Sequence, residues 1–381
     1  MKKINLLYLF LLILMSCQTN KENNVNTHTM ELVKQDDNYI ALNCIFEDFQ
    51  VVPFENNRKC MLGDVRRLFV RNDKIYVYDQ NGIPGIYRFN MDGSFDKRVG
   101  EVGHGKNEYV YVEDVAVDKN GNVIVLSALD KIQIYNSDCE YEKTIEMNSN
   151  MGLKNLVYVN GIYVGAAEHS DYNGYDESLL YFFDERFNLI GQKVERIQKN
   201  FTIPSLVNTP LDSDGGQCCF FDFYRNQFFV INKETLQTLN VYNVKTNDTY
   251  DIDDVLNGRL EKSENVYDFL TDEFILNNKL LGWMIYEKKR CFFEYDITSG
   301  ESHVYQYLGL SPTVLYYDQN YYYTIFDLQQ LLSFIEECRE SDSSNEFYQA
   351  LMKCNSNICL TDNLYLVKMK HKDIITTLTF E

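Results

Sequence analysis

The sequence predicts an all-β fold, a six-bladed β-propeller with a short α-helical insertion in the last blade. Two observations lead to this prediction. Tyr and Phe favour the half-buried surfaces of strands, and they number 29 and 24 in the 381-residue chain, against a single Trp. A unit of strand, polar turn and second strand also recurs six times at a mean spacing of about 49 residues, a length typical of propeller blades.

Each recurring unit is an apolar strand, a turn rich in Asn, Gly or Asp, and a second apolar or aromatic strand. Turns of this composition tolerate the positive φ of tight hairpins. Further strands follow clearly in four of the units, so six four-stranded blades account for the folded part of the chain. A β-sandwich with an appended domain is the alternative. The middle residues of the second strands are Tyr76, Ile124, Tyr163, Phe229, Leu281 and Tyr322.

The N-terminus has the pattern of a secretory signal. Lys2 and Lys3 precede an apolar run, 4–15, which is shorter than the roughly 20 residues that cross a bilayer as a helix. Ser16 followed by Cys17 resembles a bacterial lipobox, in which the Cys is acylated and becomes the mature N-terminus. The alternative is an ordinary signal peptide with an incidental Cys.

We therefore predict a lipoprotein signal peptide over residues 1–16, a flexible tether over 17–38 and a propeller over 39–381. The tether is polar and has no apolar periodicity. Gln18 stands where an inner-membrane lipoprotein would carry Asp, which favours the outer membrane and leaves the periplasmic or surface leaflet open.

The formal net charge of −20 argues against nucleic acid as a partner, because such binding neutralises phosphates with Lys and Arg. It also argues against electrostatic adhesion to anionic lipid, so the lipid on Cys17 must supply the membrane affinity.

Nine cysteines remain after Cys17, and their spacings match no zinc site. One disulfide among Cys338, Cys354 and Cys359 is plausible for an exported protein, whereas most of the others suit buried free thiols.

The last blade contains the insertion, which spans about 327–362. Apolar residues at spacings of three and four predict two amphipathic helices there, which either pack over a blade or cap the central opening. These residues are Leu328, Leu331, Leu332 and Ile335, and then Phe347, Tyr348, Leu351 and Met352.

The long connections between strands predict a loop-rich face, where binding residues are usually presented. They cover 165–177, 193–219, 253–265 and 327–362. The first of them combines acids, an imidazole and aromatic rings, which suits a sugar or peptide ligand, although a solvated loop is the alternative. Its candidate residues are Glu168, His169, Asp171, Tyr172 and Tyr175.

A stretch from Val65 to Ile145 resembles the NHL-like six-bladed β-propeller lipoproteins of Bacteroidetes. The segment 99–109 is similar to that family's glycine-rich blade linker, with Lys106-Asn107 in place of its usual Pro-Gly, and 52–55 is similar to the segment before its first blade. The resemblance implies the fold and an exported, lipid-anchored setting. We add Glu108 and Tyr109 of the linker to the candidate ligand face.

The sequence predicts no catalytic residue, metal site or cofactor. The segment 212–216 resembles part of a calcium loop but lacks the acidic ligand at Phe223, so we expect a turn. We expect a binding or scaffolding module for a glycan, peptide or protein. The alternative is a metal-dependent hydrolase or lactonase of the gluconolactonase-like propeller type, for which Asp114 and Asp222 are candidate ligands.

Overall fold

The protein is described by a computed structural model that covers residues 24–372 with gaps. The longer gaps are 198–215, 246–267, 270–273, 308–313, 342–348 and 350–363. Cys17, the signal peptide and the calcium-like turn up to residue 215 lie outside the described residues, as does the second helix of the insertion.

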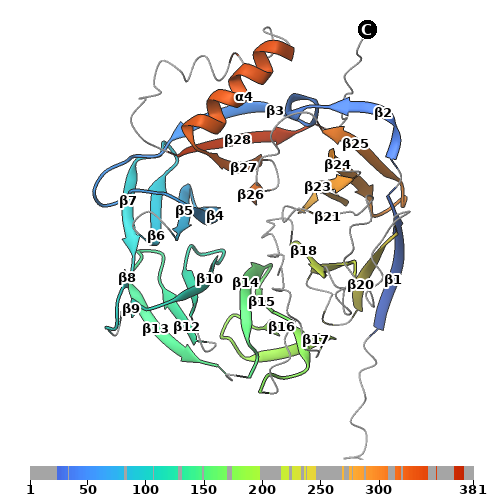
Figure 1. The fold of residues 1–381 in the computed structure, drawn as a ribbon. Helices are drawn as coiled ribbons and strands as arrows, with labels where there is room; N and C mark the ends of the chain where they lie inside the picture. The colour runs from blue at the N-terminus through green and yellow to red at the C-terminus, as the bar shows by residue number, and fades with distance from the viewer. Residues whose placement is uncertain are drawn as a thin grey trace, which may run out of the picture.

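Six sheets stand around a central axis as the blades of a propeller (Figure 1). The predicted fold class is therefore confirmed, and the β-sandwich alternative is wrong. Blade 1 contains β4 (Val65–Arg71), β5 (Lys74–Asp79), β6 (Gly85–Asn90) and β7 (Phe95–Val99). Blade 2 contains β10 (Val112–Val117), β11 (Val123–Ser127), β12 (Lys131–Tyr135) and β13 (Tyr141–Glu146), and blade 3 contains β14 (Leu153–Val159), β15 (Ile162–Ala167), β16 (Ser178–Phe183) and β17 (Leu189–Glu195).

The last three blades each take their outermost strand from the N-terminal segment. Blade 4 contains β18 (Gln217–Asp222), β19 (Gln227–Asn232), β20 (Thr238–Lys245) and β1 (Asn24–Glu31). Blade 5 contains β21 (Asp268–Phe269), β22 (Phe274–Leu276), β23 (Lys279–Tyr286), β24 (Lys289–Asp296), β25 (Ser302–Tyr307) and β2 (Lys34–Ile40). Blade 6 contains β26 (Val314–Tyr317), β27 (Tyr321–Phe326), β28 (Tyr365–His371) and β3 (Phe46–Pro53).

The N-terminal segment therefore wraps around half of the ring (Figure 1). β1 and β2 add to their blades in parallel, whereas β3 pairs antiparallel with β28 and closes the ring between the two ends of the chain. The four-residue helix α2 (Leu42–Ile45) joins β2 to β3.

This arrangement corrects the tether predicted over residues 17–38, because the chain forms strands from Asn24 onward. The sequence of β1 lacks the alternation of apolar and polar residues that marks a half-buried strand. Only Met30 among its described side chains is buried, and the remainder of the strand is exposed. Its order comes instead from backbone pairing with β20, which requires no apolar alternation.

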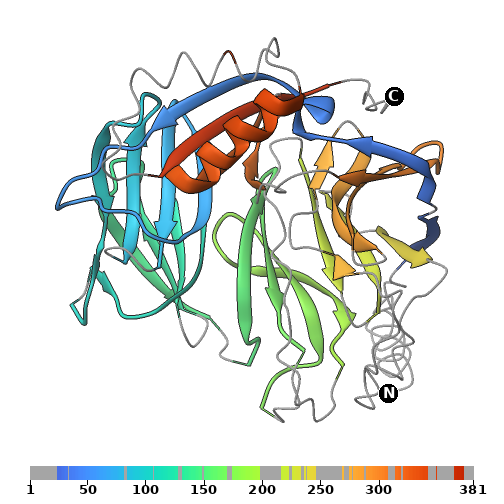
Figure 2. The same ribbon diagram turned by 45° about the horizontal axis from the view of Figure 1, so that its top comes forward.

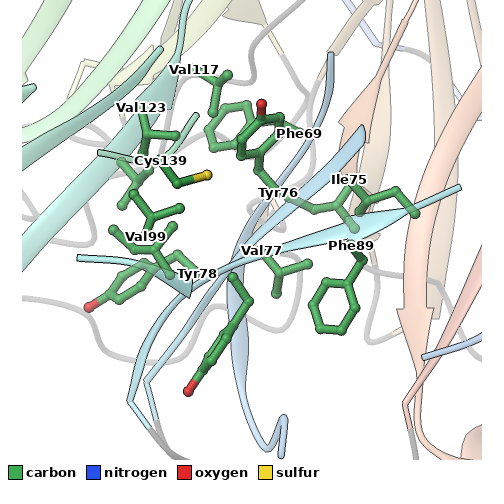
Figure 3. Close-up of a cluster of buried hydrophobic side chains, with 14 of the residues drawn as sticks. Phe69, Ile75, Tyr76, Val77, Tyr78, Phe89, Val99, Val117, Val123 and Cys139 are labelled. Atoms are coloured by element: carbon green, nitrogen blue, oxygen red, sulfur yellow. The ribbon is translucent and has the colours of Figure 1, made fainter. Parts of the chain in front are cut away.

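The aromatic residues fill the spaces between blades, as the composition predicts. Figure 3 shows such a cluster, in which Phe69 and Tyr76 of blade 1 approach Val117 and Val123 of blade 2. The hydroxyl of Tyr76 also donates to the carbonyl of Gly121 in blade 2 at 3.3 Å. The rings therefore contribute both apolar burial and cross-blade hydrogen bonds.

The helix of the insertion, α4 (Leu328–Ser341), lies at the periphery of blade 6 (Figure 2). Leu331 is buried in the core cluster that blade 6 shares with blade 5, whereas Leu332 is 45% exposed. The helical insertion is confirmed in its first part. Neither α2 nor α4, the helices of the described residues, has the length and hydrophobicity of a membrane-crossing helix.

Six cysteines in the described part of the chain are buried thiols outside any disulfide, which agrees with the prediction for most of them. They are Cys44, Cys60, Cys139, Cys218, Cys219 and Cys291. The disulfide predicted among Cys338, Cys354 and Cys359 lies outside the side chains that the structure describes.

Gly93→Ala is expected to destabilise the fold by about 2 kcal/mol or more, because the turn between β6 and β7 holds this residue at φ +83°. An added Cβ would stand 2.1 Å from the carbonyl oxygen of Pro53, the last residue of β3. Gly161, at φ +94° with open space around its Cβ position, is the matched control for the backbone effect alone. Denaturant unfolding measures the free energy lost in each variant. Equal losses for Gly93→Ala and Gly161→Ala would contradict the proposed clash with the Pro53 carbonyl.

Candidate functional site

The inner strands of blades 1, 2 and 3 each contain a β-bulge near their start. Pairing shifts register between Val65 and Arg67 in β4, and at the equivalent places in β10 and β14. Bulges redirect a side chain and occur often next to binding sites. The residues at the three bulges are Arg66, Glu113 and Lys154, so charges of alternating sign occupy the same position in neighbouring blades.

Lys154 connects these bulges to the predicted ligand loop. Its Nζ lies 2.9 Å from Oε1 of Glu113. Burial alone would lower the pKa of Lys154, but the hydrogen bond and charge of Glu113, followed by the electrostatic effects of Glu168 and Tyr175, raise it. We call Glu113, Lys154, Glu168 and Tyr175 the rim cluster. It contains two of the predicted ligand residues.

His169, another predicted ligand residue, joins blade 3 to blade 4. Its Nε2 lies 3.1 Å from Oδ1 of Asp222, and its Nδ1 accepts the backbone N–H of Ile197 at 3.1 Å. Because Nδ1 accepts, the proton of the neutral ring sits on Nε2 and is donated to Asp222. The side chain is only 6% exposed, so His169 serves the junction between blades rather than an open ligand face.

Asp222 is the buried centre of this junction, at the end of β18. In addition to the hydrogen bond with His169, its carboxylate accepts a hydrogen bond from Nη1 of Arg225 at 2.5 Å. Burial by itself would raise the pKa of Asp222, but the hydrogen bond from His169, followed by the charge and hydrogen bond of Arg225, lowers it below the ordinary value. The carboxylate therefore remains ionised, with its charge balanced inside the protein.

Tyr175 covers a buried guanidinium. The Cζ atom of Arg196 lies 4.9 Å from the centre of the Tyr175 ring, in a cation–π contact. Nη2 of Arg196 donates to the carbonyl of Met151 at 2.5 Å, while Nε and Nη1 have no hydrogen-bond partner among the described residues. Gly152, at φ +63°, leaves room for the ring, because an added Cβ would come within 2.8 Å of it.

The linker residues have structural roles. Tyr109 is 2% exposed, donates to the carbonyl of Val99 at 3.1 Å and accepts the N–H of Ile86 at 3.2 Å. Burial raises its pKa to about 12, against the opposing backbone hydrogen bond from Ile86. Glu108 accepts the N–H of Gly105 at 2.7 Å. Tyr109 therefore belongs to the core and not to a ligand face.

This linker forms two short parallel strands, β8 (Glu101–Val102) and β9 (Glu108–Tyr109). Next to them, Val110 and Tyr111 are 60% and 57% exposed. Of the remaining predicted ligand residues, Asp171 and Tyr172 lie outside the described residues.

Asp114 of blade 2, a candidate metal ligand, accepts hydrogen bonds from the two neighbouring blades. Arg67 of blade 1 donates Nε to its Oδ1 at 2.6 Å and Nη2 to its Oδ2, and the backbone N–H of Leu156 in blade 3 donates to Oδ2 at 2.8 Å. Asp114 and Arg67 are 3% and 5% exposed. No group of three or more possible metal-ligating residues occurs within the described ranges.

Sequence reasoning missed the arginines of these sites. Arg67 left no distinct signal, because β4 contains three arginines and the sequence does not show which of them is buried against a carboxylate. Arg196 left none, because its contact with Met151 joins positions 45 residues apart. Arg225 lies only three residues after the candidate Asp222, and this spacing was the signal that could have identified it.

The fold has a close counterpart among solved structures. A protein from Bacteroides fragilis, described as exported, is similar over 92% of this chain and 100% of its own, with a TM-score of 0.64 and 14% identity. Weaker likenesses are BamB from Moraxella catarrhalis (TM-score 0.33, 9% identity, 67% and 63% of the two chains) and the extracellular domain of a hybrid two-component system from B. thetaiotaomicron (0.40, 10%, 72% and 30%). At these identities the likeness shows the fold alone.

No curated protein matches the chain. A family model matches residues 25–370, which include all six blades, and the chain therefore belongs to the family described as domain of unknown function DUF4934.

Proposed function

We propose that this protein is an exported, lipid-anchored propeller that binds a peptide or protein partner through the rim cluster. The observation that carries the proposal is the repeated β-bulge. It places a charged residue, Arg66, Glu113 or Lys154, at the equivalent position of three adjacent inner strands. A rigid scaffold that presents alternating charges suits recognition of a polar chain.

A binding role is favoured over the metal-dependent hydrolase by the state of the inner-strand carboxylates. Both oxygens of Asp114 accept hydrogen bonds, from Arg67 and from Leu156, and Asp222 is held by His169 and Arg225. A cation at either place would have to displace an arginine that balances the same charge.

A peptide or protein is favoured over a glycan by the distribution of aromatic side chains. Trp283, the single Trp, is fully buried in the core, and Tyr109 is buried as well. Val110 and Tyr111, which precede Glu113 in the chain by three and two residues, remain exposed and offer apolar contacts of the kind common in protein interfaces.

Elemental analysis of dialysed protein tests the class of function. We expect no stoichiometric calcium or zinc, and retained metal at one equivalent would contradict the binding module.

Photo-crosslinking in intact cells tests the surface: a partner crosslinked by the unchanged protein should be lost with Lys154→Glu and retained with Lys143→Glu. Lys143 is exposed on β13, away from the rim cluster. Equal loss in both variants would contradict the assignment of the rim.

Export and the anchor rest on the N-terminal pattern and on the resemblance to NHL-like lipoproteins. Cys17→Ser is expected to move the protein from the outer-membrane fraction to the soluble fraction, because no polybasic segment replaces the acyl chains. Fractionation with labelled palmitate checks this. An unchanged membrane fraction without label would contradict the anchor.

A further inference from the structure

Blade 4 has an outer surface almost without charge. Its two outermost strands, β1 and β20, contain sixteen residues, of which Glu31 and Lys245 are the only Asp, Glu, Lys or Arg. These two lie at the same end of the strands, with 3.6 Å between the Lys245 nitrogen and the Glu31 oxygen. The seven residues of β1 from Asn24 to Met30 carry no formal charge with His28 neutral.

The outer strands of other blades differ in this respect. β3 contains Glu47 and Asp48 without a Lys or Arg, and β13 contains Glu142 and Glu146 against the single Lys143, so both strands are net negative. β7 contains Asp96 together with Lys97 and Arg98 and is net positive. An anionic bilayer would therefore repel β3 and β13, whereas it would not repel β1 and β20.

The start of β1 also lies close to the proposed lipid anchor along the chain. Six residues separate Cys17 from Asn24, which makes seven steps along the chain, and a fully extended chain covers at most about 3.6 Å per step, or about 25 Å in all. Because Asn24 begins a strand paired with Thr238, the anchor restricts blade 4 more tightly than any other blade. β7 of blade 1 lies on the opposite side of the ring (Figure 1).

We propose that the outer surface of blade 4, formed by β1 and β20, rests against the membrane that holds the lipid anchor. The inference rests on the proposed acylation of Cys17. It orients the propeller with its ring edge, rather than either opening, toward the lipid, and it leaves blade 1 farthest from the bilayer.

The packing of β1 supports a stable surface. Asn26 Nδ2 donates to Oδ1 of Asn240 at 3.3 Å, and the His28 ring stacks on Tyr242 with 4.7 Å between centroids. Side chains alternate between the faces of a strand, so Val25 and Thr27 occupy the other face, and both are exposed.

Energy transfer to lipid measures this orientation. A donor dye is placed on full-length lipidated protein through Thr27→Cys or, as the matched control, Lys97→Cys on β7. The vesicles contain phosphatidylethanolamine and phosphatidylglycerol with an acceptor on the headgroups. Because the short connection limits the distance of blade 4 from the anchor, we expect transfer from position 27 to exceed that from position 97 by about twofold or more. The unsubstituted protein gives the labelling background.

Two outcomes overturn the inference. Equal transfer from both positions, on vesicles that retain the protein and lose it with Cys17→Ser, contradicts the orientation and leaves the anchor intact. Failure of the protein to remain on the vesicles at all overturns the anchor and the orientation together. A Gly-Ser insertion between Asn20 and Lys21 lengthens the connection and is expected to reduce the difference between the two positions.

Discussion

Asp114→Ala is expected to lower the free energy of unfolding by about 3–5 kcal/mol, the largest effect of any single exchange proposed for this protein. The substitution leaves the guanidinium of Arg67, 5% exposed, without its counter-charge, and it removes the acceptor of the Leu156 N–H. The loss falls on three inner strands together, since Arg67, Asp114 and Leu156 belong to blades 1, 2 and 3. Guanidinium chloride unfolding measures it as a lower midpoint.

The paired substitution Arg67→Met with Asp114→Leu separates the buried charge from the contact. Replacing both partners with apolar side chains of similar size removes the uncompensated charge, so we expect most of the lost stability to return. If the double variant is as unstable as the sum of the two single variants, the ion pair is not what the Asp114→Ala loss measures.

Asp222→Asn is expected to cost about 2 kcal/mol or more at neutral pH, because it weakens charged hydrogen bonds from His169 and Arg225 at the junction of blades 3 and 4. The cost should depend on pH. The pKa of Asp222 in the folded protein is lower than the ordinary value of 3.8, so the folded state favours the ionised form. Its contribution is complete above that value and is lost as the pH falls through the folded pKa.

The pH dependence gives the decisive measurement for this site. The difference in unfolding free energy between the unchanged protein and Asp222→Asn should be constant from neutral pH down to about 5 and then shrink in more acidic buffer. Arg186→Gln, an exchange on the turn between β16 and β17, is the control and should show no such decrease. If the difference in unfolding free energy grows on acidification, the pKa of Asp222 is not lowered in the folded protein.

Much of the fold could be predicted because its signals are local. The polar turns of the repeat have the backbone that their composition requires: Asn72 and Asp73 have φ of 50° and 56°, and Asn160 has φ of 45°. The apolar strands beside them form the hairpins of blades 1 and 3. The first helix of the insertion followed from the spacing of Leu328, Leu331 and Ile335.

The site could be predicted only in part. Glu168 and Tyr175 act electrostatically on Lys154, an inner-strand residue that the loop pattern did not include. His169 was recognised as a chemically capable residue, but its burial against Asp222 depends on a residue 53 positions away. Tyr109 carries no local sign that its hydroxyl would be enclosed between Val99 and Ile86.

The sequence alone determined the number of blades, the position of the helix and the N-terminal targeting pattern, because alternation, turn chemistry and apolar runs act over a few residues. Only the tertiary structure decided that residues 24–53 form the outermost strands of three blades, and that Arg67 and Arg225 hold the carboxylates considered as metal ligands. Backbone pairing at an open sheet edge requires no side-chain pattern, and a buried charge can be balanced by any partner that the fold brings to it.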